Sequence, residues 1–280
     1  MSALLPAPVG VFDSGLGGLT VARELLRDAR ERVVYVGDSI HMPYGGRDPG
    51  EVRAFTLAIG RFLVAQNCRA LVVACNTITS VAVEALRASV PVPVVGMEPG
   101  IKPAALQTRT GKIGVLATNG TTRATRYAQL VERFSQTVSI QTQPCPGLAD
   151  RVEAGDFDGP QTRALLETYV RPLLNVGVDA LVLGCTHYPV LVPILAEIAG
   201  PDVAIVDTGP AVARQLWRVS PLPTSTRETS FGSRLLCCTT GNLEAFAPSA
   251  FRILGDLVPH KSVQWSKLHW KKGELSDGAD

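Results

Sequence analysis

Two cysteines in similar local sequences are the residues of this chain best suited to do chemistry. Residues 71–77 (LVVACNT) and 181–187 (LVLGCTH) each run as an apolar stretch, a small residue, a Cys and two polar residues. The two cysteines, Cys75 and Cys185, lie 110 positions apart. Thiols at equivalent ends of two strands predict a site with one thiol on each face of a substrate. Such a site can remove a proton from one side of a carbon and return one from the other side.

The polar residues after each Cys add hydrogen-bonding groups to the two thiols. Asn76 and Thr77 follow the first Cys, whereas Thr186 and His187 follow the second, so only the second thiol has an imidazole beside it. We predict that a helix begins after each Cys, with Pro189 well placed to begin the second one. A thiol near a helix N-terminus has its thiolate stabilised by the dipole and the unpaired amides.

Two other kinds of site use the same residues. A Cys nucleophile with a His base, as in a hydrolase, explains Cys185 and His187 but leaves Cys75 without a function. A metal site built from both thiols and His187 lacks a fourth ligand at a typical spacing. The remaining cysteines show no CxxC spacing and are predicted to be small buried hydrophobic residues in a reducing compartment: Cys68, Cys145, Cys237 and Cys238.

A glycine-rich segment, residues 13–18 (DSGLGG), follows the first predicted strand and precedes a helix. Its spacing is not that of a dinucleotide-binding or P-loop motif, and Asp13 would repel a phosphate. We therefore predict a tight turn whose backbone N–H groups and Ser14 hydroxyl meet a small anion such as a carboxylate. The alternative is that Asp13 and Ser14 only cap the following helix.

Short apolar runs alternate with amphipathic stretches through the first hundred residues. The predicted strands are 9–12, 33–36, 70–74 and 92–95, and the predicted helices between them are 20–30, 51–66 and 79–88. Most of these strands are continuously apolar, which is typical of a parallel sheet covered on both faces. Ligands of such sheets bind at the carboxyl ends of the strands, which is where both cysteines fall.

The pattern then starts again. Residues 112–118 resemble 9–14 at an offset of 104, and residues 203–207 resemble 94–98 at an offset of 109. Together with the Cys pair, three strand ends share nearly one offset, which predicts an internal duplication. The predicted fold class is α/β, with two similar three-layer parallel-sheet domains related by a pseudo-twofold axis and a site at their interface. Chance similarity between two α/β halves is the alternative, and the Cys pair favours duplication.

The crossover between the two domains is predicted near 99–103. The first domain takes residues 1–99 plus 210–265, the second takes 100–209, and a frayed polar tail takes 266–280. The last part of the first domain is predicted to hold a helix, a Pro/Ser/Thr-rich connection, a strand and a second helix: 211–219, 220–229, 234–239 and 243–254.

Composition excludes several classes of function. The 280 residues are 46% hydrophobic and 19% charged, as in a globular protein with a sizeable core, and the net charge is +2. This charge gives no electrostatic case for binding nucleic acid or a membrane surface. No stretch approaches the roughly 18 apolar residues of a membrane span, and the N-terminus has no secretory pattern, so we expect a cytoplasmic protein.

The motifs, taken together, closely resemble those of the glutamate racemases of the cofactor-independent Asp/Glu racemase family. The resemblance runs from about residue 9 to about residue 254 and rests on four segments in the right order: 13–18, 43–45, 75–77 and 184–189. It implies two facing domains that close on glutamate, an amino-acid racemase of the isomerase class, and a supply of D-glutamate for bacterial peptidoglycan.

The same resemblance implies roles for individual residues. Cys75 would take the α-proton from D-glutamate and Cys185 from L-glutamate. Asp13 would assist the first thiol and His187 the second, and Glu153 matches a further acidic residue near the site. The implied ligand contacts are Asp13, Ser14, Tyr44, Gly45, Asn76, Thr77, Thr118, Thr121, Thr186 and His187.

The predicted chemistry is difficult for a thiol, whose ordinary pKa of about 8.5 makes it a weak base for the α-proton of an amino acid. Many enzymes of this kind use pyridoxal phosphate on a Schiff-base lysine. Lys102 and Lys112 are the only lysines before residue 261, and neither has a suitable context. We therefore predict no cofactor and no metal, and a site that buries the substrate and aims donors at its carboxylate.

Two alternatives stay open at this stage. The chain could act on aspartate or another small diacid, because the length of the pocket cannot be read from the residues. It could keep the scaffold and bind a protein partner, since some family members are reported to inhibit DNA gyrase. A homodimer is compatible with the sequence. The presence of Cys75, Cys185, Asp13 and His187 together favours retained catalysis.

Overall fold

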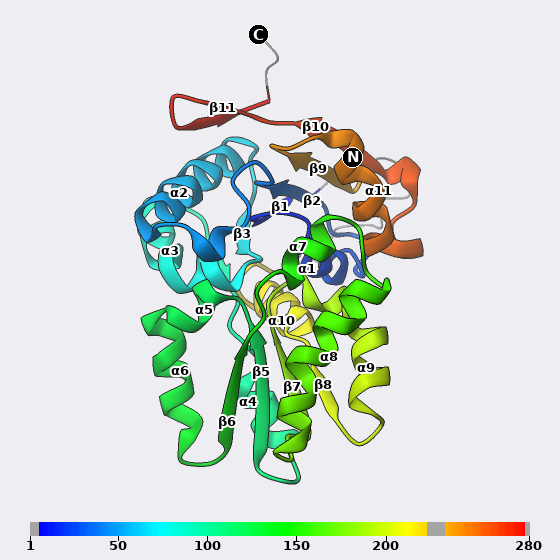
Figure 1. Cartoon of the computed structure of the whole chain (residues 1–280). Coiled ribbons are helices and arrows are strands. Elements are labelled where there is room, and N and C mark those ends of the chain that lie inside the picture. Colours follow the sequence, from blue (N-terminus) through cyan, green and yellow to red (C-terminus); the bar gives the residue numbers. More distant parts are fainter. Residues whose placement is uncertain (1–5, 223–232, 278–280) are drawn as a thin grey trace.

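In the computed structural model, which describes residues 6–222 and 233–277, the chain folds into two α/β units joined by two crossovers (Figure 1). Each unit is built on its own sheet, with the strand orders β10-β9-β2-β1-β3-β4 and β6-β5-β7-β8. Neighbouring strands in both sheets are parallel, as the continuous apolar runs predict.

The first unit contains most of the N-terminal third of the chain and the C-terminal elements. Its strands are β1 (Val9–Asp13), β2 (Val33–Gly37), β3 (Ala70–Val73), β4 (Val94–Gly96), β9 (Leu235–Thr239) and β10 (Val263–Lys267). Its helices are α1 (Leu19–Leu25), α2 (Pro49–Ala65), α3 (Asn76–Ser89), α10 (Gly209–Val219) and α11 (Leu243–Leu254).

The second unit repeats the core of the first. Its strands are β5 (Lys112–Ala117), β6 (Ser139–Pro144), β7 (Ala180–Gly184) and β8 (Ala204–Val206). Its helices are α4 (Ile101–Gln107), α5 (Asn119–Arg123), α6 (Thr125–Ser135), α7 (Leu148–Glu153), α8 (Pro160–Asn175) and α9 (Val192–Ala199). The order β6-β5-β7-β8 matches β2-β1-β3-β4, as an internal duplication predicts.

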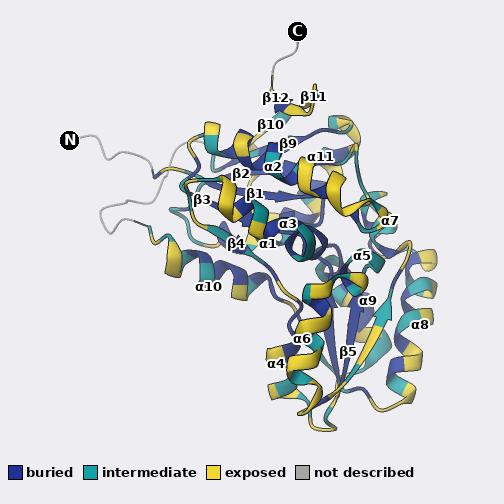
Figure 2. Cartoon of the chain, turned by 90° about the vertical axis from the view of Figure 1, so that its left-hand side faces the viewer, coloured by how far each residue is buried: buried dark blue, intermediate teal, exposed yellow. Residues whose placement is uncertain are grey.

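Both sheets are middle layers, with helices on each face. Along β1, Val11 packs into the buried cluster that includes α1, α10 and α11, whereas Phe12 packs into the cluster with α2 and α3. This alternation follows from the two-residue period of a strand. Figure 2 shows the result, with buried strands between helices whose outer faces are exposed.

One apolar cluster crosses from the first unit into the second. It contains Leu16 and Val72 of the first unit together with Leu166 and Leu183 of the second, and all four are essentially inaccessible to solvent. Because this core is shared, the two units hold each other in place at the carboxyl ends of their strands.

The prediction of a frayed polar tail from residue 266 is wrong for the described residues. β10 continues to Lys267, and a hairpin follows, made of β11 (His269–Lys271) and β12 (Glu274–Ser276). Leu268 and Leu275 are buried in the cluster with α2. One apolar residue in each short strand gives too little periodicity to be read from the sequence.

Other elements differ in detail from the predictions. The sequence did not indicate β6, because it is an edge strand rich in Ser, Gln and Thr. Helix α1 ends at Leu25 rather than at residue 30. The predicted helix at Pro189 begins as a 3-10 turn, Tyr188–Leu191, which α9 continues. Of the predicted connection 220–229, residues 223–229 lie outside the described residues.

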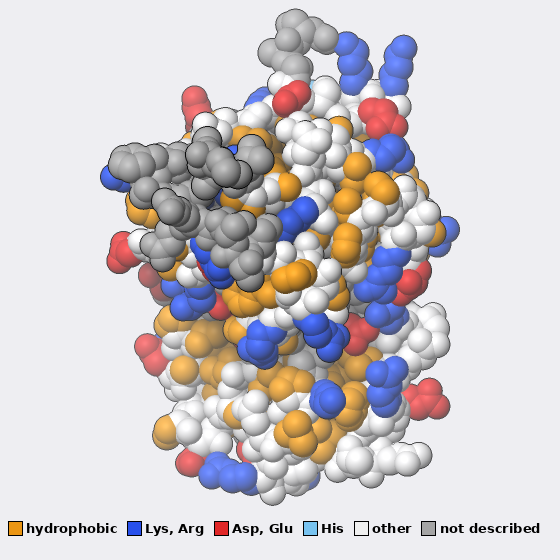
Figure 3. All heavy atoms as spheres, turned by 180° about the vertical axis from the view of Figure 1, so that it is seen from behind, with side chains coloured by type: hydrophobic (Ala, Val, Ile, Leu, Met, Phe, Trp, Pro, Cys, Tyr) orange, Lys and Arg blue, Asp and Glu red, His pale blue; other side chains and the backbone are white. Residues whose placement is uncertain are grey.

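The outer surface carries charges of both signs. The face seen in Figure 3 has Lys and Arg side chains interspersed with Asp, Glu and apolar groups over both units. Within the described residues, no helix is both long and apolar enough to cross a membrane.

Candidate active site

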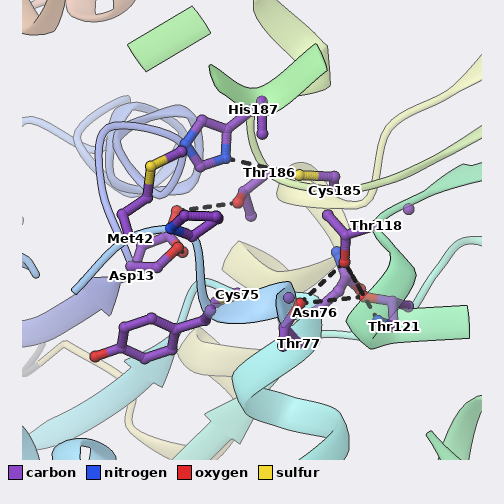
Figure 4. A pocket seen from close by; sticks show the side chains of 16 residues that line it. Asp13, Met42, Cys75, Asn76, Thr77, Thr118, Thr121, Cys185, Thr186 and His187 are labelled. Atoms are coloured by element: carbon purple, nitrogen blue, oxygen red, sulfur yellow. Dashed lines mark hydrogen bonds between the residues drawn. The ribbon is translucent and has the colours of Figure 1, made fainter. Parts of the chain in front are cut away.

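The predicted site residues meet in a cavity between the two units, at the carboxyl ends of the strands (Figure 4). Its walls come from the turns after β1, β2 and β3 in the first unit and after β5 and β7 in the second. The lining residues are Asp13, Ser14, Met42, Pro43, Tyr44, Gly45, Cys75, Asn76, Thr77, Thr118, Thr121, Ala149, Gly184, Cys185, Thr186 and His187.

Cys75 follows β3 and is the N-cap residue of α3, as predicted. It is only 6% exposed. Burial raises the pKa of this thiol well above its usual value, the negative charge of Asp13 raises it further, and the backbone N–H of Ile78 opposes both effects. The helix amide is thus present where we expected it, but burial outweighs it, and Cys75 is held as a neutral thiol.

Cys185 follows β7 in the second unit and has a different partner. Its Sγ lies 3.6 Å from Nδ1 of His187, and Nε2 of the same ring lies 2.6 Å from Oε1 of Glu153. Burial lowers the pKa of His187, but the hydrogen bonds to Cys185 and Glu153 outweigh it and raise that pKa well above the ordinary value. A protonated imidazole therefore lies between a sulfur and a carboxylate.

Glu153 lies behind His187 and does not line the cavity. This last residue of α7 accepts the backbone N–H of Leu16 at 2.5 Å as well as the His187 N–H. Leu16 belongs to the first unit, so the carboxylate fixes the imidazole and also ties the two units together. The prediction placed Glu153 near the site, and its contacts make it a residue that acts through His187.

Asp13 ends β1 and is fully buried beneath the cavity. Its carboxylate accepts the backbone N–H of Ser14 at 2.7 Å and the Thr186 hydroxyl at 3.0 Å. Burial raises the pKa of Asp13, although the charge of His187 and several hydrogen bonds lower it. The helix-capping alternative is wrong, because the N-cap of α1 is Gly18 and no side chain caps it.

Three threonine hydroxyls form a triangle on the opposite wall (Figure 4). Thr77 Oγ1 lies 3.1 Å from Thr118 Oγ1 and 3.4 Å from Thr121 Oγ1, and the last two are 3.1 Å apart. Thr77 belongs to α3 and the other two to α5 and its N-cap, so the triangle also spans both units.

Asn76 presents an unused donor and an unused acceptor. The residue is 2% exposed, and neither its Oδ1 nor its Nδ2 has a hydrogen-bond partner among the described residues. Buried polar groups are nearly always paired, and an unpaired one costs free energy. An unpaired amide that lines a cavity is therefore the structural mark of a group that binds a polar ligand.

Tyr44 and Gly45 form a further wall. The Tyr44 hydroxyl donates to Oδ2 of Asp38 at 2.5 Å, and burial, reinforced by Asp38, raises the pKa of this phenol well above its usual value. Tyr44 thus contributes a neutral ring rather than a free hydroxyl. A Cβ added to Gly120 of α5 would lie 2.6 Å from the Cα of Gly45, so the two backbones are in close contact across the units.

The cavity brings together every predicted site residue except Glu153. Four lining residues were not among the predicted ligand contacts: Met42, Pro43, Ala149 and Gly184. Pro43 and Gly184 lie within the segments 43–45 and 184–189 that carry the family resemblance, and Met42 directly precedes the first of them. Ala149 lies on α7, far from any motif, and the sequence carries no signal for it. Within the described residues, no cluster of metal-ligating side chains occurs.

Two repeated α/β units that share a cavity lined by buried Cys, His, Asp, Asn and Thr side chains define a two-domain α/β enzyme for a small molecule. The family model for Asp/Glu/hydantoin racemases matches residues 9–216, which include both cysteines. The chain therefore belongs to the Asp/Glu racemase family.

Relatives with known names agree with this assignment. A glutamate racemase from Pseudomonas aeruginosa is 53% identical over 219 residues, which are 78% of this chain and 83% of that protein. The crystal structure of a glutamate racemase isoform from Bacillus anthracis superimposes with a TM-score of 0.80 at 32% identity, covering 97% of this chain and 100% of that one. The Escherichia coli glutamate racemase, in complex with L-glutamate and the activator UDP-MurNAc-Ala, gives a TM-score of 0.81 at 28% identity, covering 94% and 99%.

Proposed function

We propose that this chain interconverts L-glutamate and D-glutamate by a two-thiol mechanism that uses no cofactor. The observation that carries the proposal is that Cys75 and Cys185 follow equivalent strands of the two repeated units and line one cavity. The names of the relatives point to glutamate as the substrate.

The unlike surroundings of the two thiols suggest how one direction begins. With L-glutamate bound, the Cα–H bond breaks, its proton passes to the Cys185 thiolate, and the electron pair is delocalised into the α-carboxylate. The S–H bond of Cys75 then breaks and its proton is delivered to the opposite face of Cα. The His187 imidazolium stabilises the starting thiolate, and burial keeps Cys75 protonated until it donates. The D-to-L direction runs the same steps backwards.

The polar groups of the cavity support a substrate with two carboxylates and an ammonium group. The Asn76 amide can donate through Nδ2 and accept through Oδ1, since both atoms lack partners. The hydroxyls of Thr77, Thr118 and Thr121 can reorient toward a carboxylate where enolate charge develops. Only the hydroxyl hydrogens need to rotate, because the oxygen atoms are already in place. Asn76, Thr77 and Thr121 are buried, so these groups act in a low-dielectric site.

We infer that the biological product is D-glutamate for peptidoglycan and that the protein works in the cytosol. All six cysteines are free and buried, which suits a reducing compartment. The inference that D-glutamate is made for peptidoglycan rests on the family to which the chain belongs.

The decisive experiment follows the circular dichroism of L-glutamate, D-glutamate and aspartate with purified protein and no added cofactor. Glutamate is expected to racemise from either enantiomer, and aspartate much more slowly. Absence of any rotation change with glutamate would refute the proposal. Faster turnover of aspartate would assign the chain to another diacid.

Cysteine variants test the mechanism. Cys75→Ser and Cys185→Ser are each expected to lower racemisation by about 1000-fold or more, while each retains elimination of HX from one enantiomer of a suitable glutamate analogue. Cys145→Ser is the matched control, because Cys145 is a buried thiol outside the cavity lining. Full racemase activity in either of the first two variants rules out the two-thiol mechanism.

A further inference from the structure

The C-terminal hairpin contacts the cavity wall through one buried carboxylate. Trp270 of β11 donates its indole N–H to Asp38 Oδ1 at 2.8 Å, and Oδ2 of the same carboxylate accepts the Tyr44 hydroxyl at 2.5 Å. Asp38 is fully buried, and Tyr44 lines the cavity. A continuous hydrogen-bonded chain therefore runs from the hairpin to the site.

Both carboxylate oxygens of Asp38 have hydrogen-bond partners in this region. Besides Trp270 and Tyr44, the carboxylate contacts the Thr240 hydroxyl at 2.8 Å and His41 Nδ1 at 2.9 Å. A buried carboxylate needs its partners, since losing one donor leaves part of the charge unpaired. Removing the indole N–H therefore changes the hydrogen bonds between Asp38 and its remaining partners, including the Tyr44 hydroxyl.

Aromatic packing reinforces the same connection. The His41 ring stacks on Phe55 of α2 with centroids 4.0 Å apart and an interplanar angle of 13°. Trp270 packs edge-on against His41 at 5.2 Å and lies 5.4 Å from Phe55, whose ring is 5.8 Å from Tyr44. The turn that carries His41 and Tyr44 thus lies between α2 and the hairpin.

The hairpin itself is firmly attached. The Leu268 N–H donates to the Thr239 carbonyl at 2.8 Å, and the side chains of Leu268 and Leu275 are buried with α2. Arg61 of α2 pairs with Glu274 at 2.7 Å. The hairpin lies beyond residues 9–216, where the family model matches. Figure 1 shows it as the outermost element of the first unit, at the far side of the sheet from the second unit.

We propose that Trp270 is a positioning residue: through Asp38 it holds Tyr44 and Gly45 against the second unit and so fixes one wall of the cavity. Gly45 is the residue in backbone contact with Gly120 of α5, so a shift of the turn opens the cavity at that point. The hairpin thereby controls how tightly the substrate is held. This inference rests on the proposed racemisation of glutamate for its kinetic test.

Trp270→Phe removes the indole donor and keeps an aromatic ring. We expect KM to rise about 5- to 10-fold for both glutamate enantiomers, which is part of the free energy of one hydrogen bond to a charged group, with kcat within about two-fold of wild type. Trp217→Phe is the matched control, because Trp217 Nε1 donates to Glu31, another buried carboxylate of the first unit, at 3.3 Å. Among the described residues, no hydrogen bond joins the Glu31 carboxylate to Asp38 or Tyr44. Trp217→Phe should lower the free energy of unfolding about as much as Trp270→Phe does, and it should leave KM unchanged.

A second readout needs no substrate. Hydrogen exchange of the backbone amides in residues 39–47 of the free protein should be faster in Trp270→Phe than in wild type. It should also be faster in Tyr44→Phe, which removes the hydroxyl that donates to Asp38. Trp217→Phe should leave it unchanged. Unchanged exchange of that segment and unchanged KM in Trp270→Phe would overturn the proposal, as would equal effects of the two Trp variants. If wild-type protein does not racemise glutamate, the proposed function fails, and the exchange comparison still decides the role of Trp270.

Discussion

At the scale of single residues, Cys75 and Cys185 are chemically the same group but have different neighbours. Burial raises the pKa of Cys75, and the neighbouring buried carboxylate of Asp13 raises it further. Cys185 lies beside His187, whose pKa is lowered by burial but raised well above its ordinary value by the hydrogen bonds to Cys185 and Glu153. The two thiols follow equivalent strands of the two units but have opposite electrostatic partners, so each direction of the proposed reaction depends on different residues.

The unpaired amide of Asn76 leads to a prediction about binding and stability. Asn76→Ala should raise KM for glutamate about 10-fold or more, while the melting temperature of the free protein stays equal or rises, since an unpaired buried polar group is removed. Steady-state kinetics and thermal unfolding, each on the same preparation, measure both quantities. A lower melting temperature with an unchanged KM would show that Asn76 only supports the fold.

The raised pKa of His187 predicts a pH-dependent stability. Because the folded pKa lies above the ordinary 6.5, the native state keeps a proton that the unfolded chain loses as pH rises past that value. The stabilisation is fully present below about pH 6.5 and is lost as pH rises through the folded pKa, at no more than about 1.4 kcal/mol per pH unit. In wild type, a Cys185 thiolate that takes up a proton on unfolding offsets the proton that His187 loses, so the measurement uses Cys185→Ser, in which Glu153 still raises the pKa of His187. Urea unfolding of Cys185→Ser and of Cys185→Ser/His187→Gln between pH 6.5 and 8.5 measures the slope. Equal slopes in these two variants would contradict the protonated imidazole.

The sequence identified the thiols because chemically special residues were few and recurred at equivalent strand ends. It also found Asp13 and His187 as polar residues beside them. It could not find the Asp38 contacts, because these join residues up to 232 positions apart in the chain. A buried carboxylate in a loop has no pattern of its own, and only the fold brings its four donors together.

At the scale of elements, the turn between β1 and α1 is fitted to the second unit. A Cβ added to Gly17 would lie 2.4 Å from Nδ1 of His187. A Cβ added to Gly15 would overlap sterically with the carboxylate of Glu153. The glycine-rich segment, predicted as an anion-binding turn, is thus also the surface against which the imidazole packs.

Gly17→Ala should therefore displace the His187 ring from Cys185 and lower kcat by about 10- to 100-fold in both directions, with a smaller effect on KM. Gly46→Ala is the control, since a Cβ there meets no atom within 4 Å. Racemisation assays of both variants provide the measurement. Wild-type kcat in Gly17→Ala would mean that the imidazole position is not critical.

Strands that are buried at every position could be predicted from the sequence, whereas strands with an exposed face could not. Strands β1, β2 and β3 are buried at every position, so their apolar runs were clear. Edge strand β6 and the hairpin β11–β12 are largely polar, and each is stabilised by neighbours that the local sequence does not reveal. The C-terminal hairpin was missed for this reason, although it reaches the site through Trp270.

At the scale of the whole molecule, the cavity exists only because two units meet, and one apolar core crosses between them. Domains in one chain usually move and unfold separately unless their interface is large and hydrophobic. Here the core that contains α8 of the second unit also contains α1, α10 and α11 of the first. We expect the two units to unfold as a single cooperative structure.

The distribution of tryptophan makes this testable. All three tryptophans, Trp217, Trp265 and Trp270, belong to the first unit, so their fluorescence reports on that unit alone, whereas far-ultraviolet circular dichroism reports on both. Leu166→Ala removes a fully buried side chain from α8 of the second unit and should cost about 2–5 kcal/mol. If the units are coupled, the variant shifts the tryptophan transition to lower urea as far as it shifts the dichroism transition. A tryptophan transition that stays at the wild-type midpoint would mean that the first unit is stable without the second, and the cavity could then open by separation of two independently folded units.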